Sequence, residues 1–225
     1  MQILQSPFNS SGNLLSYYRC ESNGNDEKSS INLSTTSGIN PLSFSSGKYG
    51  NAFDCDSYEA KAYSTSSYNI GGSSFTISFW AQLVSAVDSN GLFFSMSNSA
   101  NDIAIDIRHE YNAGSPRLFW KRSRNGISTP DLTYSWTPIA GRFYHIGMVY
   151  DATNIYGYLD GVQVASTATS GNGNNGSGDF IEICRQAGTL RIKMDDIAIF
   201  DTWLTELQMR QIYLDAGGYF LYNIL

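Results

Sequence analysis

Charged residues are scarce in this chain of 225 residues. Asp, Glu, Lys and Arg together make up 15%, and the formal net charge is −6. Binding to nucleic acid requires a basic surface, so we expect no nucleic-acid partner. No apolar run approaches the length of a membrane span, and we expect no transmembrane helix. Residues 1–7 show neither a basic nor a continuous apolar stretch, which predicts no secretory signal peptide.

Cysteine and histidine are also rare. The three cysteines, Cys20, Cys55 and Cys184, are too few for a disulfide framework, and each lies in an apolar, strand-like run. We therefore expect buried thiols, with one disulfide as the alternative. No cysteine has a spacing that suits zinc. We expect His145 to be a hydrogen-bonded core residue and His109, beside two charged residues, to lie in a solvated loop.

The chain is rich in the residues of a turn-rich β protein. Aromatic residues make up 14% and glycine occurs 21 times, with many Ser and Asn. Short alternating runs separated by turn residues predict strands. These runs cover residues 14–20, 51–55, 59–63, 75–82, 91–97, 103–108, 117–122, 143–150, 155–159, 162–165, 180–184 and 190–200. In the fourth of these runs, Phe75, Ile77, Phe79 and Ala81 share one face.

Two local signals are sharper than the rest. Asp160-Gly161 lies between two alternating runs and predicts a hairpin with a type I′ turn. Residues 205–216 predict the only helix, with Thr205 as N-cap and Gly217 as C-cap. We expect Leu207, Ile212 and Leu214 to contribute to its buried side. Together these patterns predict an all-β, two-sheet antiparallel sandwich with one short C-terminal helix, forming a single domain over residues 1–225 with its core at about 12–218.

Four separated segments carry a family resemblance. They are LLSYYRCESNGND (14–26), GKYGNAFDCD (47–56), FYHIGMVYD (143–151) with LDG (159–161), and MDDIAIFD (194–201) followed by the helix. In this order and spacing the chain resembles the LamG-like jelly roll of the concanavalin A-like lectin/glucanase superfamily. It departs from the family pattern at Cys55 and Ser57, where the family favours Phe and Gly.

The resemblance implies a candidate calcium site. Relatives of this fold often bind a structural Ca²⁺ between the first loop and the last strand, and Ca²⁺ prefers carboxylate and carbonyl oxygens. The implied ligands are Glu21, Asp26, Asp56, and Asp195 or Asp196. Because adjacent residues of a strand point to opposite faces, only one of the last two is expected to reach the ion.

The acidic residues do not suggest a glycosidase. A retaining enzyme needs two carboxyl groups about 5 Å apart, which corresponds to positions i and i+2 on a strand, about 6.6 Å apart. No two glutamates have this spacing, and Asp106 and Glu110 are too far apart. Asp54 and Asp56 have the spacing, but the resemblance gives them a cation-binding or structural role. We therefore predict that the chain is not an enzyme.

Exposed aromatic rings are the better functional candidates, because sugars stack on them. Trp80, Tyr156 and Tyr158 lie opposite the apparent core residues of their strands, and Trp120 is followed by two basic residues. Trp136, in an expected loop, is a further candidate, and Trp203 is expected to be structural. A fold with this many rings must expose some by chance, so for any single ring we favour packing within the protein.

These patterns predict a non-enzymatic binding or adhesion module that recognises a glycan or a protein surface. The missing signal peptide and the odd number of cysteines favour a phage or viral structural protein, exposed on a virion or an extracellular surface beside other virion subunits. An architectural decoration or assembly protein and a glycan-cleaving enzyme of the same fold are the alternatives. The apolar segment 219–222 is expected to dock on its own sandwich or on a partner subunit.

Overall fold

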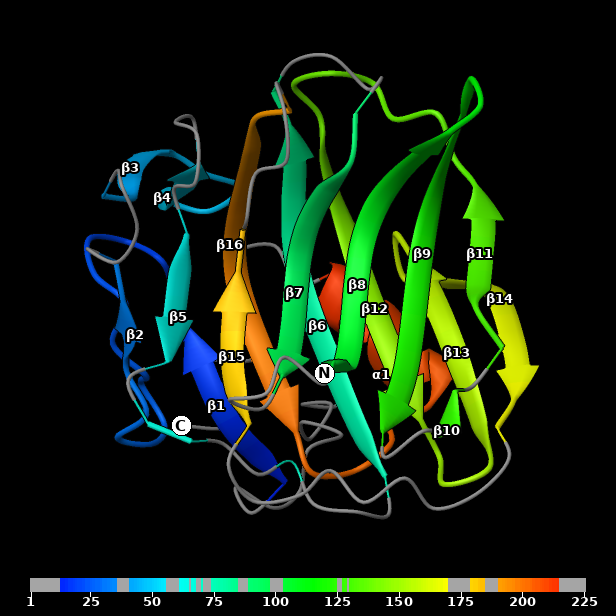
Figure 1. The fold of residues 1–225 in the computed structure, drawn as a ribbon. Helices are drawn as coiled ribbons and strands as arrows, with labels where there is room; N and C mark the ends of the chain where they lie inside the picture. The colour runs from blue at the N-terminus through cyan, green and yellow to red at the C-terminus, as the bar shows by residue number, and fades with distance from the viewer. Residues whose placement is uncertain are drawn as a thin grey trace, which may run out of the picture.

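The computed structural model describes residues 13–35, 41–55, 61–64, 66–67, 70, 74–84, 89–97, 103–124, 127–128, 130–169, 179–184 and 190–214. The described chain folds into two antiparallel sheets packed face to face, with one helix on the outside (Figure 1). This confirms the predicted all-β sandwich. No helix among the described residues is long and apolar enough to cross a membrane.

Sheet A contains eight strands. They are β1 (Leu14–Tyr18), β3 (Ser43–Ser46), β4 (Asn51–Cys55), β6 (Phe75–Leu83), β12 (Phe143–Tyr150), β13 (Asn154–Leu159), β14 (Val162–Ala168) and β16 (Ile192–Phe200). Their spatial order is β14-β13-β12-β6-β16-β4-β3, and β1 also pairs with β16. The first and last of the described strands are therefore neighbours in the sheet.

Sheet B also contains eight strands. They are β2 (Leu33–Ser34), β5 (Ala62–Ser64), β7 (Gly91–Ser97), β8 (Ile103–Asn112), β9 (Ser115–Arg124), β10 (Ile127–Ser128), β11 (Leu132–Ser135) and β15 (Phe180–Ile183). Their order is β10-β9-β8-β7-β15-β5-β2, and β11 pairs with β9. The short strands β2, β3, β10 and β11 were not predicted, because two to four residues are too few to show an alternating pattern.

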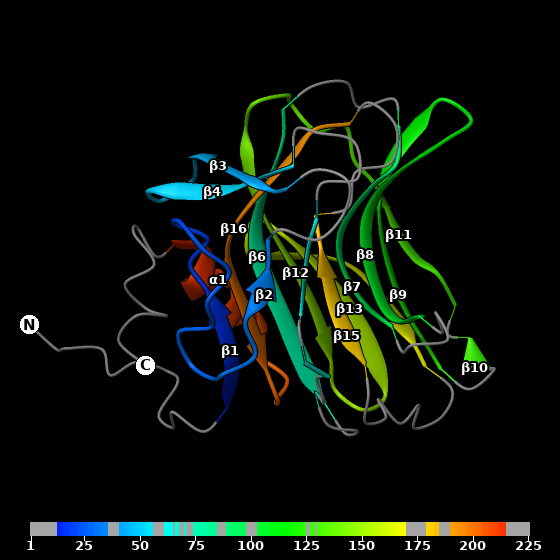
Figure 2. The same ribbon diagram turned by 60° about the vertical axis from the view of Figure 1, so that its left-hand side comes forward.

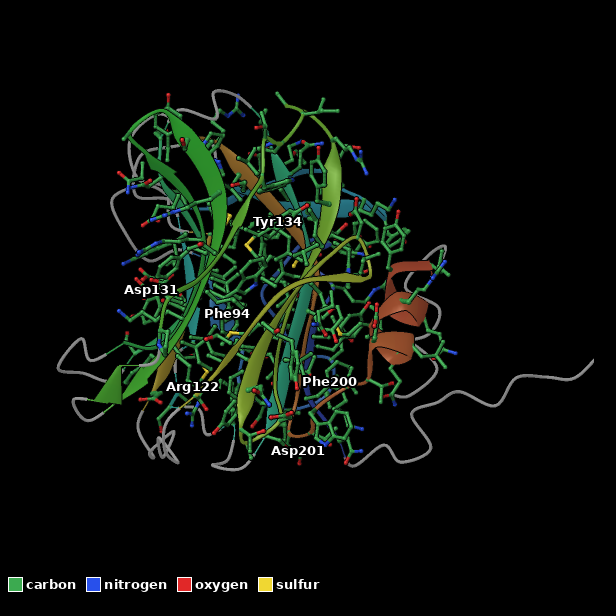
Figure 3. The ribbon with its side chains drawn as sticks, turned by 90° about the vertical axis from the view of Figure 1, so that its right-hand side faces the viewer. Phe94, Arg122, Asp131, Tyr134, Phe200 and Asp201 are labelled. Atoms are coloured by element: carbon green, nitrogen blue, oxygen red, sulfur yellow. A yellow bond between two sulfur atoms is a disulfide. The ribbon has the colours of Figure 1, made fainter. Side chains whose placement is uncertain are left out.

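The main hydrophobic core fills the space between the sheets (Figure 3). Strand β6 shows how the sequence builds it. Its alternate residues Phe75, Ile77, Phe79 and Ala81 are fully buried in this core, as predicted. The intervening residues point to the outer face of sheet A, where they are buried as well because other elements cover them.

The cover on sheet A is helix α1 (Glu206–Leu214), which lies on the side away from sheet B (Figure 2). A second apolar cluster forms beneath it, and Met209 and Ile212 are the buried residues of the helix. The predicted buried side is therefore wrong for Leu207 and Leu214, which are 66% and 63% exposed. Residues 209 and 212 lie one turn apart on the face toward the sheet.

The start of α1 follows the prediction. The Thr205 hydroxyl accepts the Gln208 amide N–H, and the Gln208 side-chain oxygen accepts the Thr205 N–H at 2.8 Å. This reciprocal pair is a capping box, which satisfies two N–H groups that the helix leaves free. The predicted C-cap Gly217 and the segment 219–222 lie outside the described residues.

The Asp160-Gly161 hairpin is also confirmed. Both residues have positive φ angles, 49° and 76°, as a type I′ turn requires. The turn joins β13 to β14 and places Asp160 beside the first residues of β12.

The cysteine prediction is wrong for two of the three residues. Cys55, at the end of β4, and Cys184, just after β15, form a disulfide that links sheet A to sheet B across 129 residues of sequence. Cys20 is the buried free thiol that the sequence predicted, and burial raises its pKa. The pairing escaped prediction because only the assembled sandwich brings the ends of these two strands together.

Candidate functional site

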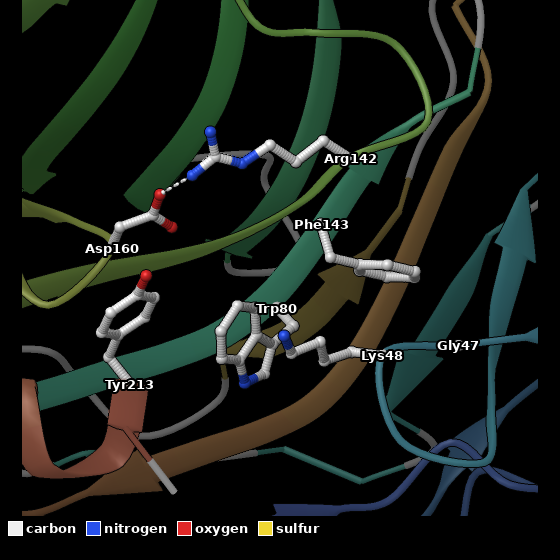
Figure 4. Close-up of a pocket in the computed structure, with 7 residues that line it drawn as sticks. All are labelled: Gly47, Lys48, Trp80, Arg142, Phe143, Asp160 and Tyr213. Carbon is white, nitrogen blue, oxygen red and sulfur yellow. Dashed lines mark hydrogen bonds and ion pairs between the residues drawn. The ribbon is translucent and has the colours of Figure 1, made fainter. Parts of the chain in front are cut away.

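A cavity of about 360 Å³ opens on the outer face of sheet A (Figure 4). Five separate segments contribute to it: the β3–β4 turn, β6, the start of β12, the β13–β14 turn and α1. Its lining residues are Gly47, Lys48, Trp80, Arg142, Phe143, Asp160 and Tyr213. The cavity therefore combines three aromatic rings with two cations and one carboxylate.

Trp80 lies at the centre of the cavity. It points outward from β6 and is only 4% exposed, because neighbouring side chains cover it. The Tyr213 ring from α1 stacks on it, with 5.6 Å between the ring centroids. The Lys48 ammonium lies 4.3 Å from the centroid of the Trp80 ring. A cation in this position is attracted to the electron-rich face of the indole.

Arg142 and Asp160 form one wall. Their side chains are joined by an ion pair of 2.7 Å (Figure 4). The second Asp160 oxygen accepts the backbone N–H of His145 at 3.0 Å. Asp160 is thus held both by its turn and by β12, and it fixes one end of the exposed Arg142 side chain.

Lys48 reaches the cavity from the β3–β4 turn, and a buried carboxylate holds that turn. Asp195 accepts the backbone N–H groups of Lys48 and Tyr49, both at 2.9 Å. Burial, together with the nearby Asp196 carboxylate, raises the pKa of Asp195 to about 8. The hydrogen bonds from the backbone N–H groups have the opposite effect, because they favour the ionised form, but they are outweighed. No described carboxylate forms an ion pair with the Lys48 ammonium.

His145 lies beneath the cavity, with its ring centroid 5.3 Å from that of Trp80. It is fully buried, and its Nε2 is 2.7 Å from the Ser78 hydroxyl. Burial lowers the pKa of His145 to about 3, so the ring is neutral at physiological pH. The prediction of a hydrogen-bonded core histidine is confirmed, and such a weak base is poorly suited to general-base catalysis.

Of the four predicted ring platforms, only Trp80 lines the cavity. Trp120 is fully buried between the sheets, where Gly157 packs against its ring, so the expectation of an exposed ring is wrong. Tyr158 is 3% exposed and belongs to the cluster under α1. Tyr156 is half-buried and donates its hydroxyl hydrogen to Asp151. These strands point the rings into packed layers rather than toward solvent.

One further expectation, for His109, is wrong, and the two remaining tryptophans can now be placed. His109 is fully buried within β8 and its Nδ1 is 3.0 Å from the Ser89 carbonyl, rather than lying in a solvated loop. Trp136 is 7% exposed and packs against His109 and Tyr144. Trp203, three residues before α1, is 50% exposed.

The candidate calcium ligands that the structure describes are engaged by protein donors. Glu21 accepts the Asn51 backbone N–H, and Asp26 accepts those of Tyr17 and Lys28. Asp195 holds the β3–β4 turn, and Asp196 accepts the Tyr17 hydroxyl at 2.6 Å. No group of three or more acidic, His or Cys side chains in the described part of the chain could hold a metal ion.

Asp56 lies outside the described residues, so a calcium site that includes it stays a prediction. A higher melting temperature with Ca²⁺ than with a chelator would support it.

The Asp195–Asp196 geometry also differs from the expected alternation. A β-bulge interrupts the pairing of β16 with β6 at this point, and Asp196 has a φ of 47°. Both carboxylates consequently contact residues outside the sandwich core, although strict alternation would place them on opposite faces. They tie β1 and the β3–β4 turn to the last strand.

The described acids offer no evident pair for hydrolysis. Arg108 bridges Asp106 and Glu110 at 2.9 and 3.1 Å. Asp54 accepts the Ser45 hydroxyl and lies near Lys193, while its possible partner Asp56 is outside the described residues.

Most of the cavity was not predicted from the sequence. Lys48 and Asp160 belong to motifs that were assigned structural roles, and Arg142, Phe143 and Tyr213 lie in otherwise ordinary segments. Only their common position on the folded sheet identifies them. The available signal was the outward face of β6, which singled out Trp80.

Comparison with known proteins agrees with the architecture. The family model Laminin_G_3, described as the concanavalin A-like lectin/glucanases superfamily, matches residues 56–210. A search of curated proteins found no match.

Among solved structures, the binding domain of Paraclostridial Mosquitocidal Protein 1 matches with a TM-score of 0.72 and 18% identity, over 89% of this chain and 52% of that one. The binding domain of Botulinum Neurotoxin DC in complex with SialylT matches with a TM-score of 0.73 and 14% identity, over 92% of this chain and 52% of that one. The chain thus spans about half the length of both binding domains.

A third structure is covered almost completely. Domain 4 of AbnA, a GH43 extracellular arabinanase from Geobacillus stearothermophilus, in complex with arabinotriose, matches with a TM-score of 0.64 and 14% identity. The match covers 89% of this chain and 98% of that one. At these identities the three likenesses establish the fold alone.

Proposed function

This chain belongs to the concanavalin A-like lectin/glucanases superfamily, and from that premise we propose that it is a non-enzymatic carbohydrate-binding module whose ligand enters the cavity on sheet A. The cavity is the observation that carries the proposal. Sugar sites combine aromatic surfaces with a few polar groups that orient the hydroxyls. Phe143 and Tyr213 supply ring surface around Trp80, and Lys48 and Arg142 supply donors.

Two of the structural relatives are consistent with this role. The arabinanase domain is described with arabinotriose and is almost wholly covered by the match, so its sugar is bound by a domain of this fold. The neurotoxin binding domain is described with SialylT, but half of that domain lies outside the match. The arabinanase domain is therefore the more informative of the two.

The disulfide supports a location outside a reducing compartment. Disulfides persist in secreted proteins and on virion or cell surfaces and are rare in the cytosol. Cys55–Cys184 is buried in the sandwich and links its two sheets. We propose an extracellular or virion surface as the place where the module acts. Detection of the intact disulfide by mass spectrometry of the protein from its natural source would test this.

A glycan array tests the binding role most broadly. The purified protein is screened once with Ca²⁺ and once with a chelator. Binding under both conditions supports recognition by the side chains of the cavity, and binding only with Ca²⁺ moves attention to the calcium prediction. A blank array with folded protein contradicts the carbohydrate role.

A matched pair of variants then places the site. Phe143→Ala removes a half-buried ring from the cavity, and Tyr134→Ala removes a comparably exposed ring from β11 of sheet B. We expect Phe143→Ala to weaken binding of a sugar found on the array by roughly tenfold, because ring stacking contributes on the order of 1 kcal/mol or more. Tyr134→Ala should leave affinity unchanged. Equal affinities for both variants would place the sugar elsewhere.

The assembly role is the second candidate, and the outer side of α1 favours it. Trp203, Leu207 and Leu214 are all at least half exposed. Leu207 and Leu214 are seven residues apart and therefore lie on one side of the helix, and Trp203 lies just before it. Such a row suits contact with another protein surface. The test is the Leu207→Glu variant. If the wild type forms an oligomer in light scattering and this variant does not, the assembly role is supported.

The predicted docking of segment 219–222 bears on the same surface. Deletion of residues 219–225 should lower the melting temperature or change the oligomeric state if these apolar residues dock on the sandwich or on a partner. An unchanged melting temperature and molar mass would contradict that prediction.

A further inference from the structure

We propose that the ligand of the sheet A cavity carries an acidic group, a carboxylate or a sulfate, and that Lys48 is the residue that selects for it. This inference rests on the proposed carbohydrate-binding function and names the class of saccharide. It follows from the balance of donors and acceptors in the cavity, from the placement of Lys48, and from the contrast with the rest of the chain.

The charge of the cavity is opposite to that of the chain. The whole chain has a formal net charge of −6. The cavity contains Lys48 and Arg142 but only one carboxylate, Asp160. A local excess of positive charge in an acidic protein attracts anions to that place rather than to the surface in general.

Both oxygens of the one carboxylate in the cavity already accept a hydrogen bond from the protein. One Asp160 oxygen accepts the Arg142 guanidinium and the other accepts the His145 backbone N–H. In Figure 4 the Tyr213 hydroxyl also points toward Asp160. A sugar hydroxyl that approaches Asp160 must therefore compete with existing donors.

The donor capacity, by contrast, is largely available. An ammonium group has three N–H donors and a guanidinium has five. Arg142 uses one terminal nitrogen on Asp160, and the Lys48 ammonium lies over the Trp80 ring, with no described carboxylate in ion-pair range. A cavity whose two cations offer more donors than its one carboxylate offers acceptors fits a ligand group that only accepts hydrogen bonds. Carboxylate and sulfate oxygens are such groups.

The backbone fixes where the charge of Lys48 is presented. Asp195 is fully buried and holds the Lys48 and Tyr49 N–H groups, so the β3–β4 turn is tied to β16. The turn directs the Lys48 side chain across Trp80, and the Tyr49 ring lies edge-on to the same indole, with 6.0 Å between centroids. An acidic group beside Trp80 can therefore pair with Lys48 while the sugar ring contacts Phe143 or Tyr213.

The test compares matched saccharides that differ only in the acidic group. One arm uses an oligosaccharide ending in a uronic acid against its neutral hexose counterpart. The second arm uses a sulfated oligosaccharide against its unsulfated form. Affinities are measured by calorimetry at low and at physiological ionic strength, for the wild type and for Lys48→Met, Lys48→Arg and Lys121→Met. Lys121 is the control because it lies on sheet B and pairs with Asp131.

We expect the wild type to bind at least one acidic saccharide roughly tenfold more tightly than its neutral counterpart, because a charge-assisted hydrogen bond contributes more than a neutral one. Salt should reduce this preference. Lys48→Met should abolish the preference, because it should lower affinity for the acidic saccharide far more than affinity for the neutral one. Lys48→Arg and Lys121→Met should keep the preference. The arm that shows it identifies the acidic group.

The inference is overturned if the wild type binds both members of each pair equally, or if Lys48→Met keeps the preference. In either case, the proposed carbohydrate-binding function remains supported if a neutral sugar binds the wild type and Phe143→Ala weakens that binding. If no saccharide of either kind binds, the proposed function itself fails, and the inference fails with it.

Discussion

The outer faces of the two sheets handle their charged residues differently. On sheet B, Arg108 pairs with Asp106 and Glu110, Arg117 also pairs with Glu110, and Lys121 pairs with Asp131. On sheet A, Arg142 pairs with Asp160, but Lys48 lies on the Trp80 ring and pairs with no described carboxylate. Each of these sheet B cations therefore has a carboxylate partner, whereas the Lys48 ammonium on sheet A has none among the described residues.

The two faces also differ in what covers them. Phe119 on sheet B is covered by the Arg108 guanidinium, 4.1 Å from the ring centroid. On sheet A, α1 and the β3–β4 turn cover the strands and leave a cavity between them. On sheet A the cavity forms where the helix and the turn meet over the strands. On sheet B the charged side chains pair with one another along the strands.

Loss of the disulfide should lower the free energy of unfolding more than any other change considered. It should affect both faces, because Cys55–Cys184 joins the two sheets. We expect the double variant Cys55→Ala/Cys184→Ala to lose about 4 kcal/mol of unfolding free energy, because the bond closes a long loop in the unfolded chain. Urea unfolding measures this. A reductant should destabilise the wild type and leave the double variant unchanged. A wild type insensitive to complete reduction would contradict the expectation.

The buried Asp195 should make stability depend on pH. Its pKa is about 8 when folded, against an ordinary value of 3.8. Between these values the unfolded chain releases the proton and the folded chain keeps it, so stability falls as pH rises from about 4 to about 8. One pKa unit corresponds to about 1.4 kcal/mol, and we expect Asp195 to cost the folded state at least that much at pH 8.

Asp195→Asn removes the ionisation and keeps an acceptor for the β3–β4 turn. Urea unfolding from pH 4 to 8 should therefore show a smaller decline for this variant than for the wild type. Parallel pH profiles for the two proteins would exclude this role for Asp195. The same variant should leave the ion pairs on sheet B unaffected, which makes it specific to the face that contains the cavity.

Removal of an ion pair on sheet B should change the free energy of unfolding least. Arg108→Ala removes contacts with Asp106 and Glu110, and about one third of the Arg108 side chain is exposed. Exposed ion pairs contribute about 0.2–1 kcal/mol each, so we expect a loss of about 1 kcal/mol in urea unfolding. Binding of a sugar found on the array should not change. A loss of sugar affinity in Arg108→Ala would shift the functional face to sheet B.

Local patterns in the sequence predicted the parts of the fold that depend on neighbouring residues. The two faces of β6, the type I′ turn at Asp160-Gly161 and the capping box at Thr205 are examples. In each case the deciding interaction spans only a few residues. The outward direction of Trp80 followed from the same alternation and was the one part of the cavity that the sequence indicated.

Long-range arrangements were not predictable in this way. The Cys55–Cys184 bond, the burial of Trp120 and the approach of Lys48 to Trp80 all depend on which strands become neighbours. The bulge at Asp195 and Asp196 is a further case, because one extra residue changes which side chains face the outer layer. Asp195 and Asp196, two of the acids in the calcium prediction, accept protein donors in this arrangement.

The most direct measurement is an NMR titration of the ¹⁵N-labelled protein with a saccharide found on the glycan array. Binding in the proposed cavity should shift the indole N–H signal of Trp80 and the backbone signals of Lys48, Arg142, Asp160 and Tyr213, while those of Arg108, Arg117 and Lys121 stay unchanged. Shifts confined to the sheet B residues, with the Trp80 signal unmoved, would contradict the assignment of ligand binding to sheet A.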